Sequence, residues 1–251
     1  MKIIVCCKVV PEEQDIAIRP DRGIDLSRAS AKISQYDLNA LEAAAQLAGA
    51  DGEVVALSAG SSRWLDNTKI RKDILSRGPG SLELVMDDSL ENALPDRTAD
   101  VLSAAASAIG FDLLLFGEGS GDLYAQQVGL LVGEKLGLPT INAVRAIRLE
   151  GAGVVVERDL EDVTEVLEMP LPAALCVSSD INVPKIPTMK AILAAGKKPV
   201  NCRNSGEAGA PRSVLASVLA PEAAERLHTI FEGDSEENMA AFAEQVRKAC
   251  Q

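Results

Sequence analysis

The chain has 251 residues, 47% of them hydrophobic, and this length favours one large α/β unit with appendages. Lysine and arginine number 25 against 37 acidic residues, so the formal net charge is −12, and so acidic a surface repels nucleic acids and anionic membranes. The single histidine, His228, excludes a multi-histidine metal site and is expected to be solvated or packed.

The five cysteines form no CxxC pair and are odd in number, so a disulfide framework is not expected. We interpret them as reduced thiols of a cytoplasmic protein. The first ten residues hold an apolar run that is too short for a signal peptide, and no stretch approaches the ~18 apolar residues of a membrane span.

Strands and helices alternate over the first two thirds of the chain. Apolar runs predict strands at 2–10, 53–60, 82–87 and 111–117. Helical patterns are found at 34–49, about 65–75, 95–109 and about 122–136. Strands separated by helices of this length imply an α/β fold, in which a Rossmann-like parallel sheet has helices on both faces.

The pattern changes at residue 141. Short alternating runs over about 141–172 predict an antiparallel hairpin insertion, and residues 173–177 then return to the sheet. An extended segment with one short helix follows residue 180, and residues 201–214 are typical of a linker. The tail at 235–250 is an amphipathic helix with Met239, Phe242 and Val246 on one face and Ser235 as N-cap. We therefore expect an α/β domain at 1–200, and a linker with a helical tail at 201–251.

The loop "GEGSGDLYAQQVG" (117–129) follows a predicted strand and precedes a predicted helix. Backbone N–H groups of residues 119–124 at a helix start are suited to a phosphate, and a tight turn is an equally good reason for the glycines. Neither the dinucleotide fingerprint nor the P-loop fits, since residue 122 is aspartate and no Gly-Lys-Ser/Thr follows. Asp122 is expected to be an N-cap or to accept a ribose hydroxyl, and Gln127 is either solvated or a contact to a sugar or base.

Other charged or reactive groups point to no catalytic chemistry. The acidic residues at 158–168 are expected to lie on solvated faces rather than to bind a metal. The basic segments at 69–72 and 196–199 suggest a solvated helix face and a partner contact. No nucleophile lies next to a base, so hydrolytic catalysis is not supported and the chain is not expected to be an enzyme.

Taken together, these motifs resemble a known family, the β subunit of electron-transfer flavoproteins, and most closely its Fix-type (FixA) branch. The segments that carry the resemblance are "VCCKVVPEEQD" (5–15), "YDLNALEAA" (36–44), "ALSAG" (56–60), the glycine loop, "VERDLEDVTEVLEMPLPA" (156–173) and "INVPKIPTMKAIL" (181–193). Leu123 and Tyr124 stand where the family has small or acidic residues, so the identity of the nucleotide stays open.

The resemblance implies an electron-carrier subunit that forms a heterodimer with a larger α subunit. The α subunit is implied to hold the redox FAD with help from this chain, and the pair to relay electrons between dehydrogenases and a quinone or other acceptor. The chain's own pocket is implied to hold AMP or, in electron-bifurcating members, a second FAD. The tail is implied to pack on the α subunit.

Site residues follow from the same resemblance. Met189 is implied to contact a dehydrogenase. The nucleotide site is implied to comprise Cys6, Ser34, Gln35, Tyr36, Asp37, Ser58, Phe116, Gly117, Gly119, Ser120, Gly121, Asp122, Leu123, Tyr124, Ala125, Gln126 and Gln127.

A rival hypothesis is a nucleotide-binding regulator or an ATP-hydrolysing protein of the same fold. Such a protein needs an early phosphate loop, such as SGGxDS after the first strand, and "VVPEEQD" in that place does not match. ATP turnover by the isolated chain would favour this alternative.

Overall fold

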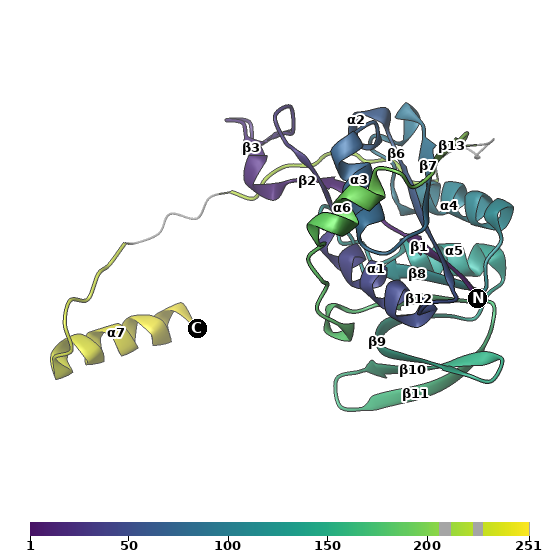
Figure 1. Ribbon diagram of the computed structural model, residues 1–251. Helices are drawn as coiled ribbons and strands as arrows, with labels where there is room; N and C mark the ends of the chain where they lie inside the picture. The colour runs from purple at the N-terminus through teal and green to yellow at the C-terminus, as the bar shows by residue number, and fades with distance from the viewer. Residues whose placement is uncertain (206–211, 223–227, 251) are drawn as a thin grey trace.

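The computed structural model describes residues 1–205, 212–222 and 228–250 (Figure 1). Within these residues a nine-stranded sheet has the order β11-β10-β9-β12-β8-β1-β6-β7-β13. Its strands are β1 (Lys2–Cys6), β6 (Glu53–Gly60), β7 (Ser81–Met86), β8 (Leu113–Gly117), β9 (Thr140–Glu150), β10 (Gly153–Asp159), β11 (Thr164–Pro170), β12 (Ala173–Val177) and β13 (Val200–Arg203). The pairs β1–β6, β1–β8, β6–β7 and β8–β12 are parallel, which confirms the predicted Rossmann-like sheet.

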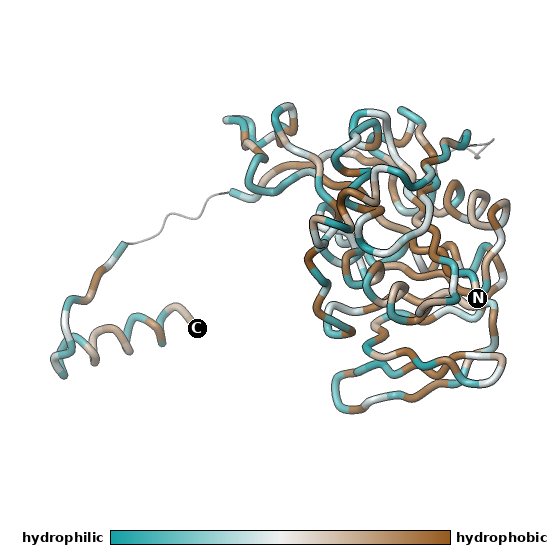
Figure 2. The backbone as a smooth tube through the Cα atoms, in the orientation of Figure 1, coloured by the Kyte–Doolittle hydropathy of each residue, from teal (hydrophilic) through white to brown (hydrophobic). Residues whose placement is uncertain are grey.

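Helices cover both faces of this sheet, as predicted. Side chains alternate along β1, so Ile3 and Val5 enter the core that contains residues of α1 and α3, whereas Ile4 enters the core beneath α4 and α5. Figure 2 shows hydrophobic residues concentrated in the central strands. The helices are α1 (Gln35–Ala48), α2 (Ser62–Leu65), α3 (Thr68–Ser76), α4 (Pro95–Ile109), α5 (Val128–Leu136), α6 (Met189–Ala195) and α7 (Glu236–Ala249).

The antiparallel insertion is also confirmed. Strand β10 pairs antiparallel with both β9 and β11, and β9 joins the parallel part of the sheet beside β12. Val154 and Val156 on β10 are buried, while alternate residues of β11, the edge strand, are exposed. The insertion thus extends the sheet at one edge, as Figure 1 shows.

Two predicted elements are divided in the structure. The predicted strand at 2–10 is wrong in its continuity, because β1 ends at Cys6 and β2 (Val9–Pro11) pairs with β5 (Ala31–Ile33) in a small separate sheet. The helical region predicted at about 65–75 corresponds mainly to α3, which begins at Thr68, and it is divided from α2, which ends at Leu65. Asn67 divides them, since its side chain accepts hydrogen bonds from the N–H groups of Lys69 and Ile70 and so caps a new helix.

The segment predicted as a linker begins inside the sheet. Its first residues belong to β13, which pairs parallel with β7 and aligns Cys202 with Leu84. The segment "VNCR" is short and has few apolar residues, so its own sequence does not predict a strand. Pairing with the neighbouring strand β7 determines its structure. Residues 206–211 of the predicted linker lie outside the described residues.

Residues 212–222 connect two distant parts of the domain. Asp96, at the start of α4, accepts hydrogen bonds from the backbone N–H groups of Arg212 and Ser213. Leu219 then forms a β-bridge with Gly23, in the hairpin of β3 (Ala17–Ile18) and β4 (Ile24–Asp25). The chain therefore returns from α4 to this N-terminal hairpin.

The tail helix α7 stands apart from the α/β domain (Figure 1). Ser235 caps it as predicted, since its hydroxyl accepts a hydrogen bond from the N–H of Asn238. Met239, Phe242 and Val246 are all exposed on one face of α7, and the ring of Phe231 contacts Phe242 there with 5.8 Å between centroids. In the part of the chain described, no helix combines the length and apolarity that a membrane crossing requires.

Candidate functional site

The candidate site lies where the strand order reverses. The chain passes from β1 to β6 and β7 on one side, and later to β8 and β12 on the other side. In open α/β sheets, ligands bind at the carboxyl ends of the strands beside such a reversal. The residues after β1, the start of α1 and the glycine loop after β8 are joined there by hydrogen bonds.

Asp37 connects the ends of the two central strands. Its carboxylate accepts a 2.7 Å hydrogen bond from the backbone N–H of Lys8, just after β1, and a 3.1 Å one from that of Gly117, at the end of β8. Burial raises the pKa of the Asp37 carboxyl group to about 7, although both N–H donors and Lys8 act in the opposite direction. Asp37 thus joins the segments after β1 and at the end of β8 from a buried position.

Lys8 and Asp122 form an ion pair across the same crevice. The Lys8 Nζ atom lies 2.9 Å from Oδ1 and 2.6 Å from Oδ2 of Asp122. Partial burial acts to raise the pKa of Asp122, but the ammonium of Lys8 holds it below its usual value. Lys8 is missing from the predicted site. The signal that identifies it is its place as the first charged residue after the buried part of β1.

The glycine loop enters its helix later than predicted. Helix α5 begins at Val128, not at about residue 122, and Gln127 is its N-cap residue. Tyr124 and Gln126 have φ values of 46° and 56°, which interrupt a right-handed helix. The predicted N-cap role of Asp122 is therefore wrong, and the N–H groups without an intrahelical partner at the helix start belong to residues 128–130 rather than 119–124, since the Leu131 N–H donates to the Gln127 carbonyl.

The loop is held against the start of α1. The Ser34 hydroxyl accepts a 3.2 Å hydrogen bond from the backbone N–H of Gly121. The rings of Tyr36 and Tyr124 are in contact, and a Cβ atom at Gly119 would lie 2.5 Å from the Tyr124 ring. The structure therefore brings residues 34–37 and the loop together.

Three residues of the predicted site are buried within the sheet, Cys6 and Phe116 on the face beneath α4 and α5 and Ser58 on the opposite face. Cys6, Ser58 and Phe116 are buried, and burial raises the pKa of the Cys6 thiol, which favours its neutral form. The Ser58 hydroxyl is buried without a hydrogen-bond partner among the described residues. A buried hydroxyl without a partner is costly, so this oxygen fits a site completed by a polar ligand.

The remaining predicted residues are accessible to solvent. Leu123 and Tyr124 are 45% and 44% exposed, so two adjacent large side chains face solvent here. Gln126 donates a 3.3 Å hydrogen bond to the Tyr124 hydroxyl. Besides these, the exposed positions of the predicted site are Gln35, Gly121, Asp122, Ala125 and Gln127. The exposed part of the predicted site is thus formed by loop residues 121–127 together with Gln35.

Met189 lies on a different surface, at the start of α6. It is 72% exposed, and Ile186 and Leu193 nearby are similarly exposed. We call these three residues the α6 surface. The two predicted basic segments meet beside it, because the Lys72 side chain on α3 lies 3.6 Å from a Cβ atom built at Gly196. An apolar surface is therefore flanked by lysines in a protein that is acidic as a whole.

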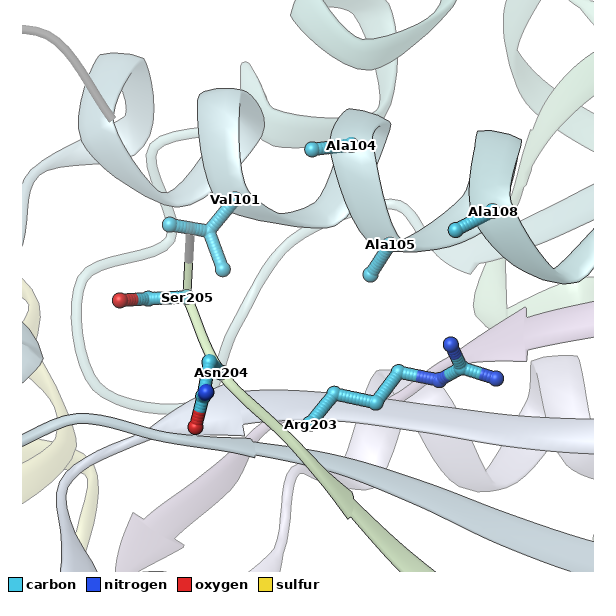
Figure 3. Close-up of a pocket in the computed structure, with 7 residues that line it drawn as sticks. All are labelled: Val101, Ala104, Ala105, Ala108, Arg203, Asn204 and Ser205. Carbon is cyan, nitrogen blue, oxygen red and sulfur yellow. The ribbon is translucent and has the colours of Figure 1, made fainter. Parts of the chain in front are cut away.

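A pocket of about 340 Å³ lies between α4 and residues 203–205, at the end of β13 (Figure 3). The helix contributes an apolar side of alanines and Val101, and the other side consists of Arg203, Asn204 and Ser205. Arg203 forms an ion pair with buried Glu83. Since the residues of the predicted site do not line this pocket, it is separate from the crevice at the strand reversal.

Comparison with known protein families gives one match over most of the chain. A family model described as "Electron transfer flavoprotein domain" matches residues 23–207. The matched range includes the start of α1, the glycine loop, the antiparallel insertion and the α6 surface. It leaves out β1, Lys8 and the helix α7.

Proposed function

We propose that this chain, which belongs to the electron transfer flavoprotein family, is the small β subunit of the Fix-type branch. In this role it is an electron-carrier component and not an enzyme, and it forms a heterodimer with a larger α subunit. Three groups of residues support the proposal: the crevice at the strand reversal, the α6 surface and the exposed face of α7.

The crevice is proposed to bind AMP or FAD. The observation that carries this proposal is the contact of the loop at 117–127 with residues 34–37, which frames a site at the strand reversal. Ser58 supplies a buried hydroxyl for the ligand, and the exposed side chains of Leu123 and Tyr124 offer apolar contact to a base or ring system. Asp122 remains a candidate acceptor for a ribose hydroxyl.

The chain's own residues serve to bind and position. The flavin, when bound, supplies the redox chemistry between dehydrogenases and a quinone or other acceptor. Asp37 fixes the ends of β1 and β8 relative to each other, and the pair of Tyr36 and Tyr124 holds the loop over the crevice. These contacts maintain the geometry of the nucleotide site and take no part in electron transfer.

Two surfaces are proposed to bind partners. The α6 surface, with Met189 at its centre, is suited to a dehydrogenase, because exposed apolar residues surrounded by charged ones are typical of interfaces. The apolar face of α7 is proposed to pack on the larger subunit. The described cysteines are all free, which agrees with a proposed cytoplasmic location.

The test is to coexpress the chain with its larger subunit, purify the complex, denature it and count the nucleotides released. One FAD and one AMP per heterodimer would support a simple carrier, and two FAD without AMP would support a bifurcating one. A chain that does not associate with the larger subunit and binds neither nucleotide would contradict the proposal. Turnover of ATP by the chain alone would favour a nucleotide-hydrolysing protein instead.

A further inference from the structure

The ion pair of Lys8 and Asp122 lies in the crevice but has no role in the function described so far. Lys8 follows β1, and its backbone N–H is fixed by Asp37. Its side chain reaches the loop that follows β8, where its ammonium contacts both oxygens of Asp122. A cation is thus held at the position in the fold where open α/β sheets bind their ligands.

The acidic groups near Lys8 make its positive charge important for binding an anion. A phosphate placed beside Asp122 meets a carboxylate that the pair with Lys8 keeps ionised. Asp37 contributes a second, buried carboxyl group within reach of the Lys8 backbone. Among the described residues joined by hydrogen bonds in this crevice, Lys8 is the basic one. An anion therefore requires Lys8 to offset the repulsion from its neighbours.

The Lys8 ammonium also has a hydrogen-bond donor left for a ligand. An ammonium has three N–H donors, and the two oxygens of Asp122 accept two of them. The Lys8 side chain is 37% exposed, so that its remaining donor is open to solvent. An oxygen of a phosphate group is a suitable acceptor for it, and a charge-assisted hydrogen bond of this type is among the stronger ones.

We propose that Lys8 binds the phosphate of the nucleotide in this crevice, and that Asp122 holds the Lys8 ammonium in place while competing with the phosphate for it. This inference rests on the proposed function as a nucleotide-binding subunit and adds a residue to its site. The alternative role of the pair is mechanical, as a clasp that fixes the loop. A clasp affects every ligand of the crevice equally, whereas a phosphate-binding cation affects only ligands that carry a phosphate.

The experiment compares the binding of AMP and adenosine to the full chain by isothermal titration calorimetry, with FAD in a parallel series. The variants are Lys8→Met, Lys8→Arg and Asp122→Asn. Lys2→Met is the matched control, because Lys2 starts β1 at the opposite end and pairs with Glu53 there. Lys2→Met removes the same charge at the other end of β1, away from the crevice.

For Lys8→Met we expect a loss of about 10- to 100-fold in AMP affinity, with adenosine affinity changed less than ~2-fold. Lys8→Arg retains most of the AMP affinity. Asp122→Asn raises AMP affinity by roughly 2- to 10-fold, because the competing charge is removed. The variants change FAD affinity in the same way as AMP affinity if the pyrophosphate of FAD occupies the position of the AMP phosphate. Lys2→Met leaves each affinity unchanged.

Equal losses of AMP and adenosine affinity in Lys8→Met would overturn the inference in favour of a clasp, as would an unchanged AMP affinity. A fall in AMP affinity in Asp122→Asn would overturn the proposed competition. If Lys8→Met does not fold, the salt dependence of the wild-type chain decides, since AMP binding must weaken with salt more steeply than adenosine binding. A wild-type chain that binds none of these ligands contradicts the proposed function itself.

Discussion

The rings of Tyr36 and Tyr124 lie 4.9 Å apart between centroids, with their planes at 41° to each other. One ring comes from the start of α1 and the other from the loop after β8, so the contact joins two of the three segments that form the crevice. Tyr124 holds this position with a positive φ, which an aromatic residue seldom adopts. The contact therefore has to offset a local backbone cost.

The first prediction concerns this ring contact. Tyr36→Leu and Tyr124→Leu are each expected to destabilise the chain, and a double-mutant cycle is expected to give a coupling energy of about 0.5 to 1 kcal/mol. The value lies at the low end because Tyr124 is partly exposed. Chemical denaturation measures the free energies of unfolding. A coupling energy near zero would show that the two rings act independently.

The second prediction concerns the glycines of the loop. A Cβ atom at Gly117 would lie 2.6 Å from the backbone carbon of Tyr36, whereas at Gly121 the nearest atom is 3.7 Å away, on the Val10 side chain. Gly117→Ala is thus expected to lower the free energy of unfolding by about 1 to 3 kcal/mol, and Gly121→Ala to change it by less than ~0.5 kcal/mol.

Gly119→Ala should fall between these two variants. Its nearest contact is the Tyr124 ring, a side chain that is able to rotate away, rather than backbone. Thermal unfolding of the three alanine variants side by side is the measurement. Similar losses at Gly117 and Gly121 would contradict the packing of this loop.

The third prediction concerns pH and Asp37. Burial raises the pKa of this carboxyl group in the folded chain to about 7, from an ordinary value of 3.8. Between these values the folded state binds more protons than the unfolded state, so the contribution of Asp37 to stability is fully present below about pH 4 and is lost as pH rises through about 7. The loss is on the order of 4 kcal/mol.

Asp37→Asn removes this titration and should flatten the corresponding part of the profile of stability against pH, while lowering stability at acidic pH because one backbone N–H loses its acceptor. Urea denaturation at several pH values between 4 and 8 gives both profiles. Asp112→Asn is the control, since Asp112 accepts the backbone N–H of Lys2 at the other end of β1. An unchanged profile in Asp37→Asn would rule out this residue as its source.

The fourth prediction concerns the apolar face of α7. Phe242→Asp places a charge on this face and is expected to weaken association with the larger subunit by at least ~10-fold, because a buried unpaired charge is costly. Ala241→Asp introduces the same charge on the other side of the helix and is expected to have little effect. Copurification and analytical ultracentrifugation measure association, and equal effects of both variants would contradict a role of this face.

The regular elements of the fold are predictable from sequence because local patterns determine them. The strand at Glu53–Gly60 and the helix at Pro95–Ile109 have the predicted bounds. The apolar run of the first is long and continuous, and Pro95 and Gly110 delimit the second. The antiparallel insertion is predictable for the same reason, since its alternation differs clearly from the buried parallel strands.

The crevice is less predictable, since its details depend on contacts between residues far apart in sequence. The place of Lys8 after a buried strand is visible in the sequence, but its partner Asp122 lies 114 residues away, and no local pattern identifies that pairing. The late start of α5 depends on two residues with positive φ that are not glycines. The predicted strand at 2–10 is interrupted after β1 because the Lys8 N–H donates its hydrogen bond to Asp37 rather than to a neighbouring strand.

The β-bridge between Leu219 and Gly23 sets the origin of a tether. The ion pair of Arg22 with Glu222 adds a second contact at the same place. Glu236, the first residue of α7, follows Glu222 by 14 residues, which span at most about 50 Å when fully extended. The start of α7 therefore lies at most about 50 Å from Glu222, and a partner that binds both α7 and the α/β domain must lie within that distance of the N-terminal hairpin.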